Sequence, residues 1–195
     1  MAYPQRSHWT EMEYLAFERQ SETKHELVDG QIIAMSGASG AHNLITASTI
    51  AALIVQVRGK NCRVFSSDMR VRAPLLGNHT YPDITVVCGE VEYTDDTLET
   101  VANPTLIVEV LSPSTERFDR NQKFQNYWRI PSLETYLLIA QDQARVERFT
   151  RQKMNEWLMT VVVGLEQEIE LASIGCTLAL ADIYQQVSLG GARRE

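Results

Sequence analysis

Two carboxylates lie inside apolar runs of the sequence, where an unpaired charge is costly. Asp83 belongs to the run YPDITVV (81–87), and Glu109 belongs to the run TLIVEVL (105–111). A buried lone carboxylate costs several kcal/mol unless it is paired, hydrogen-bonded or bound to a metal ion. The continuous Val, Ile and Leu content predicts two central strands over 82–88 and 105–111, covered on both faces of the sheet. If these strands pair, the two carboxylates approach each other where the loops leave the sheet, and they repel unless a cation lies between them.

Such a pair of acids is typical of a magnesium site. Hard cations prefer oxygen ligands, and Mg²⁺ is usually held by one or two carboxylates, with water and substrate phosphate completing its coordination. The sequence has no cluster of Cys or His residues that would select a softer metal. We therefore expect Mg²⁺ bound by Asp83 and Glu109, with Mn²⁺ able to replace it, and phosphoryl transfer as the chemistry.

A lysine that could complete this site lies on the next predicted helix, over about 115–129. Asp119, Lys123 and Tyr127 are spaced i, i+4 and i+8, so they share one face of that helix. If this face leans towards Glu109, Lys123 can orient the attacking water and stabilise the negative charge of the pentacovalent transition state. The alternative is an ordinary surface pair between Asp119 and Lys123, worth about 0.3–0.5 kcal/mol. The spacing alone leaves both interpretations open.

The other segments predict the scaffold that positions these residues. Thr10 and Glu13 form a capping box at the start of a helix, and Asp29-Gly30 is typical of a β-hairpin turn. Apolar periodicity predicts further elements, namely helix 10–20, hairpin 25–35, helix 43–57, strand 63–72, loop 74–80, strand 135–141, a strand meander over 145–151 and 156–164, and helix 178–187. This order predicts one α/β domain with a mixed central β-sheet flanked by helices, an N-terminal hairpin and extra edge strands. The domain is expected to span 10–187, between an N-terminal arm (1–9) and a flexible tail (188–195).

Length and composition fit a soluble, single-domain protein. A chain of 195 residues can bury one core, and 44% apolar with 22% charged residues is ordinary globular composition. The N-terminal MAYPQRSHWTEMEY has no apolar core of signal-peptide length, and no apolar run reaches the roughly 20 residues of a membrane span. Cys62, Cys88 and Cys176 lie far apart, which suits a reducing cytoplasm and argues against a zinc ribbon or a disulfide framework. We expect a cytoplasmic protein with no membrane partner.

Charge is distributed unevenly along an acidic chain. The net charge is −7 and the isoelectric point is about 5.2, whereas simple nucleic-acid-binding proteins tend to be basic. Residues 90–99 hold five acids and no base, and residues 58–72 hold five bases and one acid. A further group of bases lies within 117–129. Each cluster is interpreted as a solvated face, and the acidic run is not assigned to a metal site.

Five segments together resemble a bacterial family described as "putative restriction endonucleases", long catalogued as a domain of unknown function and belonging to the PD-(D/E)XK nuclease superfamily. They are YPDITVV, NPTLIVEVLSPST, RFDRNQKFQNYW, IPSLETYLLI and HELVDGQIIAMSG, and the similarity extends from about residue 10 to 187. The resemblance implies a restriction-endonuclease-like core with a mixed central β-sheet flanked by helices. It also implies that Asp83 is the first metal-binding acid, that Glu109 is the second, and that the carbonyl of Val110 is an additional ligand.

The chain departs from the superfamily pattern at one position. The superfamily's lysine is expected two residues after the glutamate, where this chain has Leu111. Lys123 is the natural substitute, because a long side chain can reach the same point in space from another element. Glu26 resembles the N-terminal glutamate that some members add to the metal site, and the alternative is a solvated strand acid. His42 could contact phosphate or a metal-bound water, or it could be a capping or packing residue.

These features predict a magnesium-dependent endonuclease that hydrolyses phosphodiester bonds in double-stranded DNA, with Arg117 and Arg120 along the backbone. One metal site cuts one strand, so a duplex cut in one event favours a homodimer. A non-catalytic module that binds DNA or protein is the alternative, and Leu111 and the acidic isoelectric point favour it. A small-molecule phosphohydrolase would use the same ions but needs a closed pocket. The target sequence and the choice of DNA or RNA depend on loop contacts that periodicity does not place.

Overall fold

The computed structural model describes residues 8–94 and 96–189 of the 195-residue chain. Most of the predicted arm (1–9) and of the predicted tail (188–195) lies outside these residues. Within the arm, Trp9 is buried, and its backbone N–H donates to the Gly30 carbonyl at 2.7 Å. Trp9 therefore belongs to the domain, next to the turn of the N-terminal hairpin.

Six strands form the central mixed sheet, in the order β11-β10-β9-β8-β6-β3. They are β3 (Cys62–Ser66), β6 (Ile84–Cys88), β8 (Leu106–Leu111), β9 (Thr135–Ala140), β10 (Arg145–Lys153) and β11 (Glu156–Val163). β6 pairs antiparallel with β8, and β8 pairs parallel with β9. Every residue of β8 is buried. The predicted pairing of the two apolar strands, and their cover on both faces, are confirmed.

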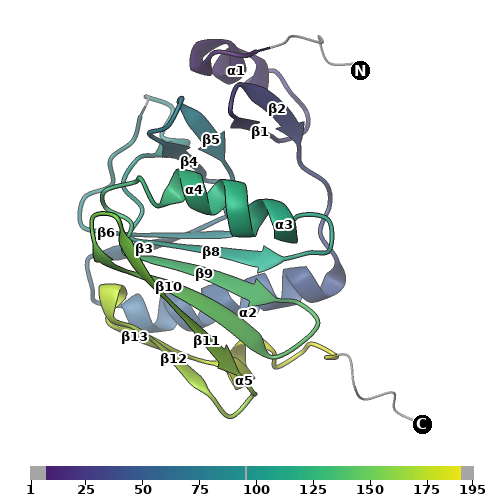
Figure 1. Ribbon diagram of the computed structural model, residues 1–195, viewed down its shortest axis with the longest axis vertical. Coiled ribbons are helices and arrows are strands. Elements are labelled where there is room, and N and C mark those ends of the chain that lie inside the picture. Colours follow the sequence, from purple (N-terminus) through teal and green to yellow (C-terminus); the bar gives the residue numbers. More distant parts are fainter. Residues whose placement is uncertain (1–7, 95, 190–195) are drawn as a thin grey trace.

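Helices cover the two faces of this sheet (Figure 1). α2 (Gly40–Val57) lies on one face, and the short helices α3 (Glu116–Phe118) and α4 (Phe124–Tyr127) lie on the other. Side chains alternate along a strand, so Val108 of β8 packs in the core with α2, and Glu109 points to the α4 side. The sheet thereby directs the Glu109 carboxylate towards the helix that carries Lys123.

A second sheet carries the N-terminal hairpin, in the order β2-β1-β5-β4-β7. Its strands are β1 (His25–Val28), β2 (Gln31–Ala34), β4 (Arg70–Ala73), β5 (Asn78–Thr80) and β7 (Thr100–Val101). Asp29 and Gly30 join β1 to β2 with positive φ angles of 50° and 77°, the conformation of a type I′ turn. The capping box of Thr10 and Glu13 begins α1 (Glu11–Glu18). The predicted hairpin and the predicted first helix are therefore confirmed.

The structure corrects two predictions in the segment between β3 and β6. The single strand expected over 63–72 is two strands, β3 and β4, which belong to different sheets and are separated by a turn at 67–69. The loop expected over 74–80 contains β5. Only Met69–Arg72 alternates strictly between apolar and polar residues, and the three consecutive polar residues Ser66, Ser67 and Asp68 mark the turn that the prediction of one strand overlooked.

The last predicted helix also differs. The whole segment 178–187 is predicted as a helix, but its first residues belong to β13 (Cys176–Ala179), and the helix α5 spans only Leu180–Ile183. β13 pairs with β12 (Glu168–Leu171) in a separate hairpin. Leu178 packs in the core with α2. Its apolar character therefore reflects the buried face of the strand β13.

Two of the cysteines are paired. Cys62 and Cys88 lie directly opposite each other on the antiparallel strands β3 and β6 and form a disulfide. Cys176 is free and buried. The expectation of unpaired cysteines is wrong at Cys62 and Cys88, because the sheet brings together two positions that are 26 residues apart in the sequence.

Candidate active site

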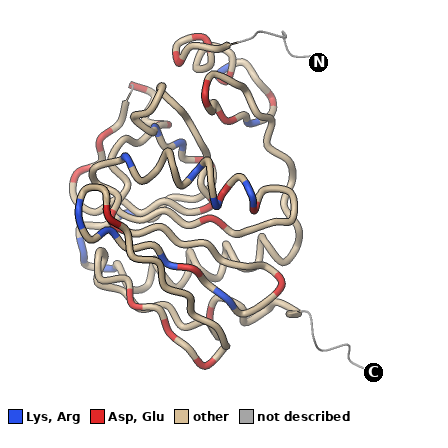
Figure 2. The backbone as a smooth tube through the Cα atoms, viewed as in Figure 1, with Lys and Arg blue, Asp and Glu red and all other residues tan. Residues whose placement is uncertain are grey.

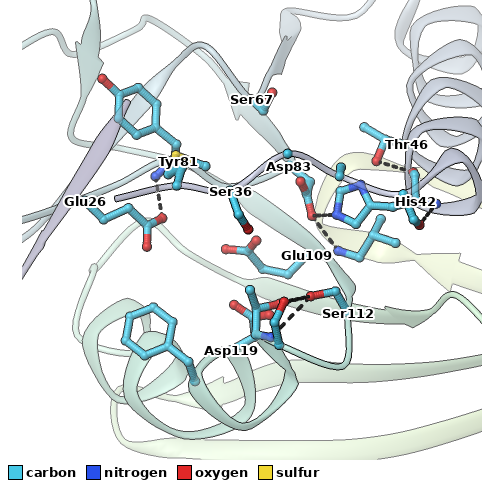
Figure 3. A pocket seen from close by; sticks show the side chains of 18 of the residues that line it. Glu26, Ser36, His42, Thr46, Ser67, Tyr81, Asp83, Glu109, Ser112 and Asp119 are labelled. Atoms are coloured by element: carbon cyan, nitrogen blue, oxygen red, sulfur yellow. Dashed lines mark hydrogen bonds and ion pairs between the residues drawn. The ribbon is translucent and has the colours of Figure 1, made fainter. Parts of the chain in front are cut away.

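A cavity of about 650 Å³ opens where the chain leaves the end of β8 (Figure 3). Its wall is formed by β1, the segment 35–39 after β2, the first turn of α2, and the segment from the end of β8 to the helix that follows. The ionisable residues that line it include Glu26, His42, Asp83, Glu109, Asp119 and Lys123. The cavity thus brings together the four side chains proposed from the sequence, and Val110 lines it as well.

Asp83 lies directly before β6 and opposite Glu109. The antiparallel register pairs Ile84 with Val108, so one further step along each chain sets Asp83 across from Glu109. Asp83 Oδ2 accepts a hydrogen bond from the Val110 N–H at 2.7 Å. Within the described part of the chain, no hydrogen bond reaches Asp83 Oδ1. One carboxylate oxygen is fixed by the neighbouring strand, and the other can accept a ligand.

The Glu109 carboxylate is buried against a lysine and a tyrosine. Lys123 Nζ and Tyr127 Oη each donate to Glu109 Oε1 at 3.0 Å. Lys123 Nζ also lies 3.2 Å from Glu26 Oε1 and 3.4 Å from Asp119 Oδ1. The Lys123 side chain is only 7% exposed. The interpretation of Asp119 and Lys123 as a surface pair is therefore wrong, because the lysine lies inside a cluster of acids.

A π-helical turn orients this part of the site. The segment predicted as one helix over 115–129 contains the turn η1 (Asp119–Lys123) between α3 and α4. A π turn accommodates one extra residue, which changes the direction of the side chains that follow, and such turns are frequent at functional sites. From the sequence, Asp119 is predicted only as a partner of Lys123, although its spacing from Lys123 and Tyr127 places all three on one face. Asp119 is in fact buried in the cavity wall.

Burial changes the ionisation of this cluster. It raises the pKa of Glu109 well above its usual range, against the opposing charge of Lys123. The neighbouring charges of Asp119 and Asp83 raise the pKa of Glu109 further. Burial also raises the pKa of Asp119. Burial alone lowers the pKa of Lys123, but the charges of Glu109 and Glu26 outweigh it, and the pKa is raised. The lysine therefore stays charged, and the surplus of carboxylates favours an additional cation.

The raised pKa of Glu109 predicts how the stability of the metal-free protein depends on pH. Because this pKa exceeds its usual 4.5 in the folded chain, the native state binds more protons than the unfolded state. The corresponding stabilisation is fully present below pH 4.5 and is lost as the pH rises through the folded pKa. Urea unfolding at a series of pH values above 4.5 should show Glu109→Gln gaining stability relative to the wild type. If the difference in free energy of unfolding between Glu109→Gln and the wild type does not change with pH, the raised pKa of Glu109 is contradicted.

His42, in the first turn of α2, contacts Asp83. Its Nε2 lies 3.2 Å from Asp83 Oδ2, and its backbone N–H donates to Ser39 Oγ, the N-cap of the helix, at 3.1 Å. Burial lowers the pKa of His42, but the hydrogen bond and the charge of Asp83 outweigh it, and the pKa is raised. Asp119 and the Val110 backbone add smaller contributions in the same direction. The backbone of His42 therefore serves the cap, whereas its ring supports Asp83.

Glu26 and Leu111 also have defined surroundings. Glu26, in β1, is buried, and its Oε1 accepts a hydrogen bond from the Tyr81 N–H at 3.0 Å. A solvated strand acid is therefore excluded. Leu111, at the position where the resemblance led us to expect a lysine, is buried in the apolar core with Tyr127. The positively charged side chain of the site comes instead from η1, where Lys123 Nζ donates to Glu109 Oε1.

The two arginines expected along a DNA backbone differ in their surroundings. Arg120 pairs with Glu116 at 2.8 Å and also with Glu147. Arg117 is exposed. Arg120 is therefore held by acids of its own chain, and Arg117 is the more exposed of the two.

The donor chemistry of the cavity fits a hard cation held by two carboxylates. Within the described residues, no hydrogen bond reaches Glu109 Oε2, and none reaches Asp83 Oδ1. Over 8–94 and 96–189, no group of three or more His, Cys, Asp or Glu residues is arranged to hold a metal ion by itself. Mg²⁺ commonly takes only one or two protein carboxylates and keeps water or substrate oxygens in its other positions. The residues present therefore fit an open magnesium site better than a closed structural one.

Comparisons with known proteins agree with this architecture. Residues 11–181 match the family model Uma2, described as "Putative restriction endonuclease". Two uncharacterized proteins of Synechocystis sp. are similar. One, sll1609, is 40% identical over 163 residues, which cover 84% of this chain and 92% of the relative. The other, slr1290, is 34% identical over 173 residues, which cover 89% of this chain and 90% of the relative.

A solved structure shares the fold. It comes from Anabaena variabilis and is described as a "putative nuclease belonging to DUF820". Its TM-score is 0.74 at 19% sequence identity, and the match covers 90% of this chain and 97% of that one. The predicted mixed sheet flanked by helices is thus confirmed, as is the resemblance identified from the sequence. Because the family model matches most of the chain, this protein belongs to the Uma2 family of "Putative restriction endonuclease" proteins.

Proposed function

We propose that this protein is a magnesium-dependent endonuclease that hydrolyses phosphodiester bonds in DNA. The observation that carries the proposal is the convergence of Asp83, Glu109 and Lys123 on one cavity, with Lys123 Nζ 3.0 Å from Glu109 Oε1. The description of the family supports a nuclease, and the fold shared with the Anabaena protein agrees with it.

The acids and the lysine that converge on the cavity have distinct roles in the proposed reaction. Asp83 and Glu109 would hold Mg²⁺ through their free oxygens, with the Val110 carbonyl as a further ligand. When bound, the ion would polarise the scissile phosphate and lower the pKa of the attacking water. Lys123 would donate a hydrogen bond to that water and offset the negative charge that develops on the phosphate. Tyr127 fixes the orientation of Glu109 through its hydrogen bond at 3.0 Å.

The two remaining acids act on Lys123. Glu26 and Asp119 lie 3.2 Å and 3.4 Å from its ammonium. Their charges keep Lys123 protonated, so it would serve as a hydrogen-bond donor and a positive charge and would not serve as a general base. They also fix the position of Nζ at the cavity wall, which a transition-state donor requires because a displacement of about 1 Å can cost 100-fold in rate.

A duplex substrate and a homodimer extend the proposal. One cavity of this kind cuts one strand, and a two-fold dimer would present two cavities to the two strands of a duplex. Exposed Arg117, which follows the cavity-lining segment 112–115, could contact a backbone phosphate. Arg117→Ala should therefore weaken DNA binding without changing the affinity for the metal.

Incubation with supercoiled plasmid tests the proposal directly. With Mg²⁺ or Mn²⁺, the wild type should convert the plasmid to nicked or linear DNA, and Asp83→Ala should leave it supercoiled. Asp182→Ala, an exposed acid on α5, is the matched control and should cleave as the wild type does. A wild type that cleaves with neither ion would refute the proposed activity, and exclusive nicking would count against a dimer that cuts both strands at once.

A non-catalytic module is the second candidate, because one observation favours it. The Lys123 ammonium is already paired with three carboxylates, and a paired ammonium has less to offer a substrate. A module of this kind would retain duplex DNA or a protein partner without cutting it. Electrophoretic mobility shifts of labelled duplex DNA, equal for the wild type and Asp83→Ala and without cleavage products, would favour this candidate.

A further inference from the structure

α2 presents an uncharged face to solvent. Its 18 residues, Gly40–Val57, contain no Lys, Arg, Asp or Glu, and Figure 2 shows the helix in tan throughout. One stripe is buried against the central sheet, namely Ile45, Thr49, Leu53 and Val57. A surface helix of a globular protein normally carries charged and polar residues on its opposite side. α2 lacks charge there, which is unusual for a face that water covers.

Apolar residues form a continuous stripe on this outer side. Leu44, Ala47, Ala51 and Val55 follow one another at intervals of three and four residues, and Ile54 flanks them. Leu44, Ile54 and Val55 are 36%, 47% and 64% exposed. Intervals of three and four residues are those of helices that pack along a common seam. We call these five residues the outer stripe.

We propose that the outer stripe is the contact surface of a homodimer in which α2 packs antiparallel against α2 of a second copy. Large side chains lie at the two ends of the stripe and small ones at its centre, so the order reads nearly the same in both directions. A two-fold axis between positions 49 and 50 sets Leu44 against Val55 of the second copy, and Ser48 against Ala51. The small central residues allow the helix axes to approach to about 8 Å. Such a contact is self-complementary, as two-fold symmetry requires.

The lack of charged side chains on α2 favours a second copy over other occupants. The helix has no acidic residue in its first turn and no basic residue in its last turn, and Arg58 follows it only as the C-cap residue, so a second copy would meet no like charge along the outer stripe. A nucleic acid or an acidic protein would instead lose hydration of its charges against a face that offers no counter-charge. The uncharged outer stripe therefore complements itself best.

A membrane is the alternative that the test must separate. Contrary to the expectation from the sequence, α2 is long and apolar enough to cross a bilayer by length and composition alone. Its buried stripe, however, belongs to the core of the central sheet, where Ile45 and Leu53 are fully buried. Helices that lie on membrane surfaces also carry Lys or Arg along their polar side, and α2 has neither. These features favour a protein partner.

Light scattering at micromolar concentration tests the dimer without any measurement of cleavage. The wild type should have twice the chain mass of 22.1 kDa, and Ala51→Glu should have the mass of one chain with unchanged circular dichroism. Leu158→Glu, at a residue 52% exposed on the edge strand β11, is the matched control and should remain dimeric. A monomeric wild type, or a dimeric Ala51→Glu variant, would overturn the proposal.

Oxidative cross-linking tests the antiparallel orientation. An equimolar mixture of Ser48→Cys and Ala51→Cys chains should give a heterodimeric disulfide in preference to either homodimeric one, and the wild type should give none. A parallel contact would favour the homodimeric products and would overturn the proposed geometry. A wild type that is monomeric and floats with phosphatidylserine-containing vesicles, when Ala51→Glu does not, would assign the outer stripe to a membrane.

Discussion

Replacing Lys123 by methionine should lower the rate of plasmid cleavage by about two orders of magnitude, the usual effect of removing one donor to a transition state. Methionine retains most of the apolar stem but removes the ammonium, which lies 3.0 Å from Glu109 and 3.2 Å from Glu26. The same variant should lower the free energy of unfolding of the metal-free protein by about 3–5 kcal/mol, because buried carboxylates lose their charged partner. Plasmid cleavage and urea unfolding at pH 7 measure the two effects separately.

Matched variants separate lost chemistry from lost folding. Lys153→Met removes a lysine whose side chain is 81% exposed, and it should change neither quantity. Adding Asp119→Asn to Lys123→Met removes one uncompensated buried charge, so it should restore part of the stability and none of the cleavage. Lys123→Arg should not rescue cleavage, because a planar guanidinium does not replace a compact ammonium. If Lys123→Met is folded and cleaves at the wild-type rate, then Lys123 only neutralises the acids around it.

The scaffold follows from signals that are local in the sequence. Asp29-Gly30 specifies the N-terminal turn because both positions adopt positive φ angles, 50° and 77°, which this dipeptide tolerates. The predominantly apolar content of β6 and β8 indicates strands covered on both faces, and β8 is buried throughout. Neither inference requires knowledge of a distant segment, and both are confirmed.

The details of the site depend on contacts between segments that are far apart in the sequence. The spacing of Asp119 and Lys123 fits a surface pair as well as a buried cluster, and only the packing of η1 against β8 decides between them. The pairing of Cys62 with Cys88 likewise depends on the register of β3 and β6, where a slip of one residue would point them to opposite faces. Local periodicity carries no information about either contact.

Manganese titrated into the metal-free protein should bind, and Asp83→Asn and Glu109→Gln should each weaken this binding by more than about 100-fold, beyond the loss typical of outer-shell partners. Each acid would supply one carboxylate oxygen to the ion, and over 8–94 and 96–189 no larger group of acids is arranged to replace it. At 100 times its dissociation constant, Mn²⁺ should also stabilise the wild type by about 2.7 kcal/mol, and neither variant should show this stabilisation. Isothermal titration calorimetry and urea unfolding with and without Mn²⁺ measure the two effects.

The variants at Glu109 and Asp119 decide what a loss of binding means. Glu109→Gln should gain stability relative to the wild type above pH 4.5, so unfolding would not explain its loss of affinity for the metal. Asp119→Asn removes a buried acid of the same cavity that is not proposed as a ligand, and it should still bind Mn²⁺. If Asp119→Asn weakens binding as much as Asp83→Asn does, then the cavity attracts cations by its charge alone and holds no defined site. A wild type that does not bind Mn²⁺ would remove the metal site, and with it the reaction that Asp83 and Glu109 are proposed to support.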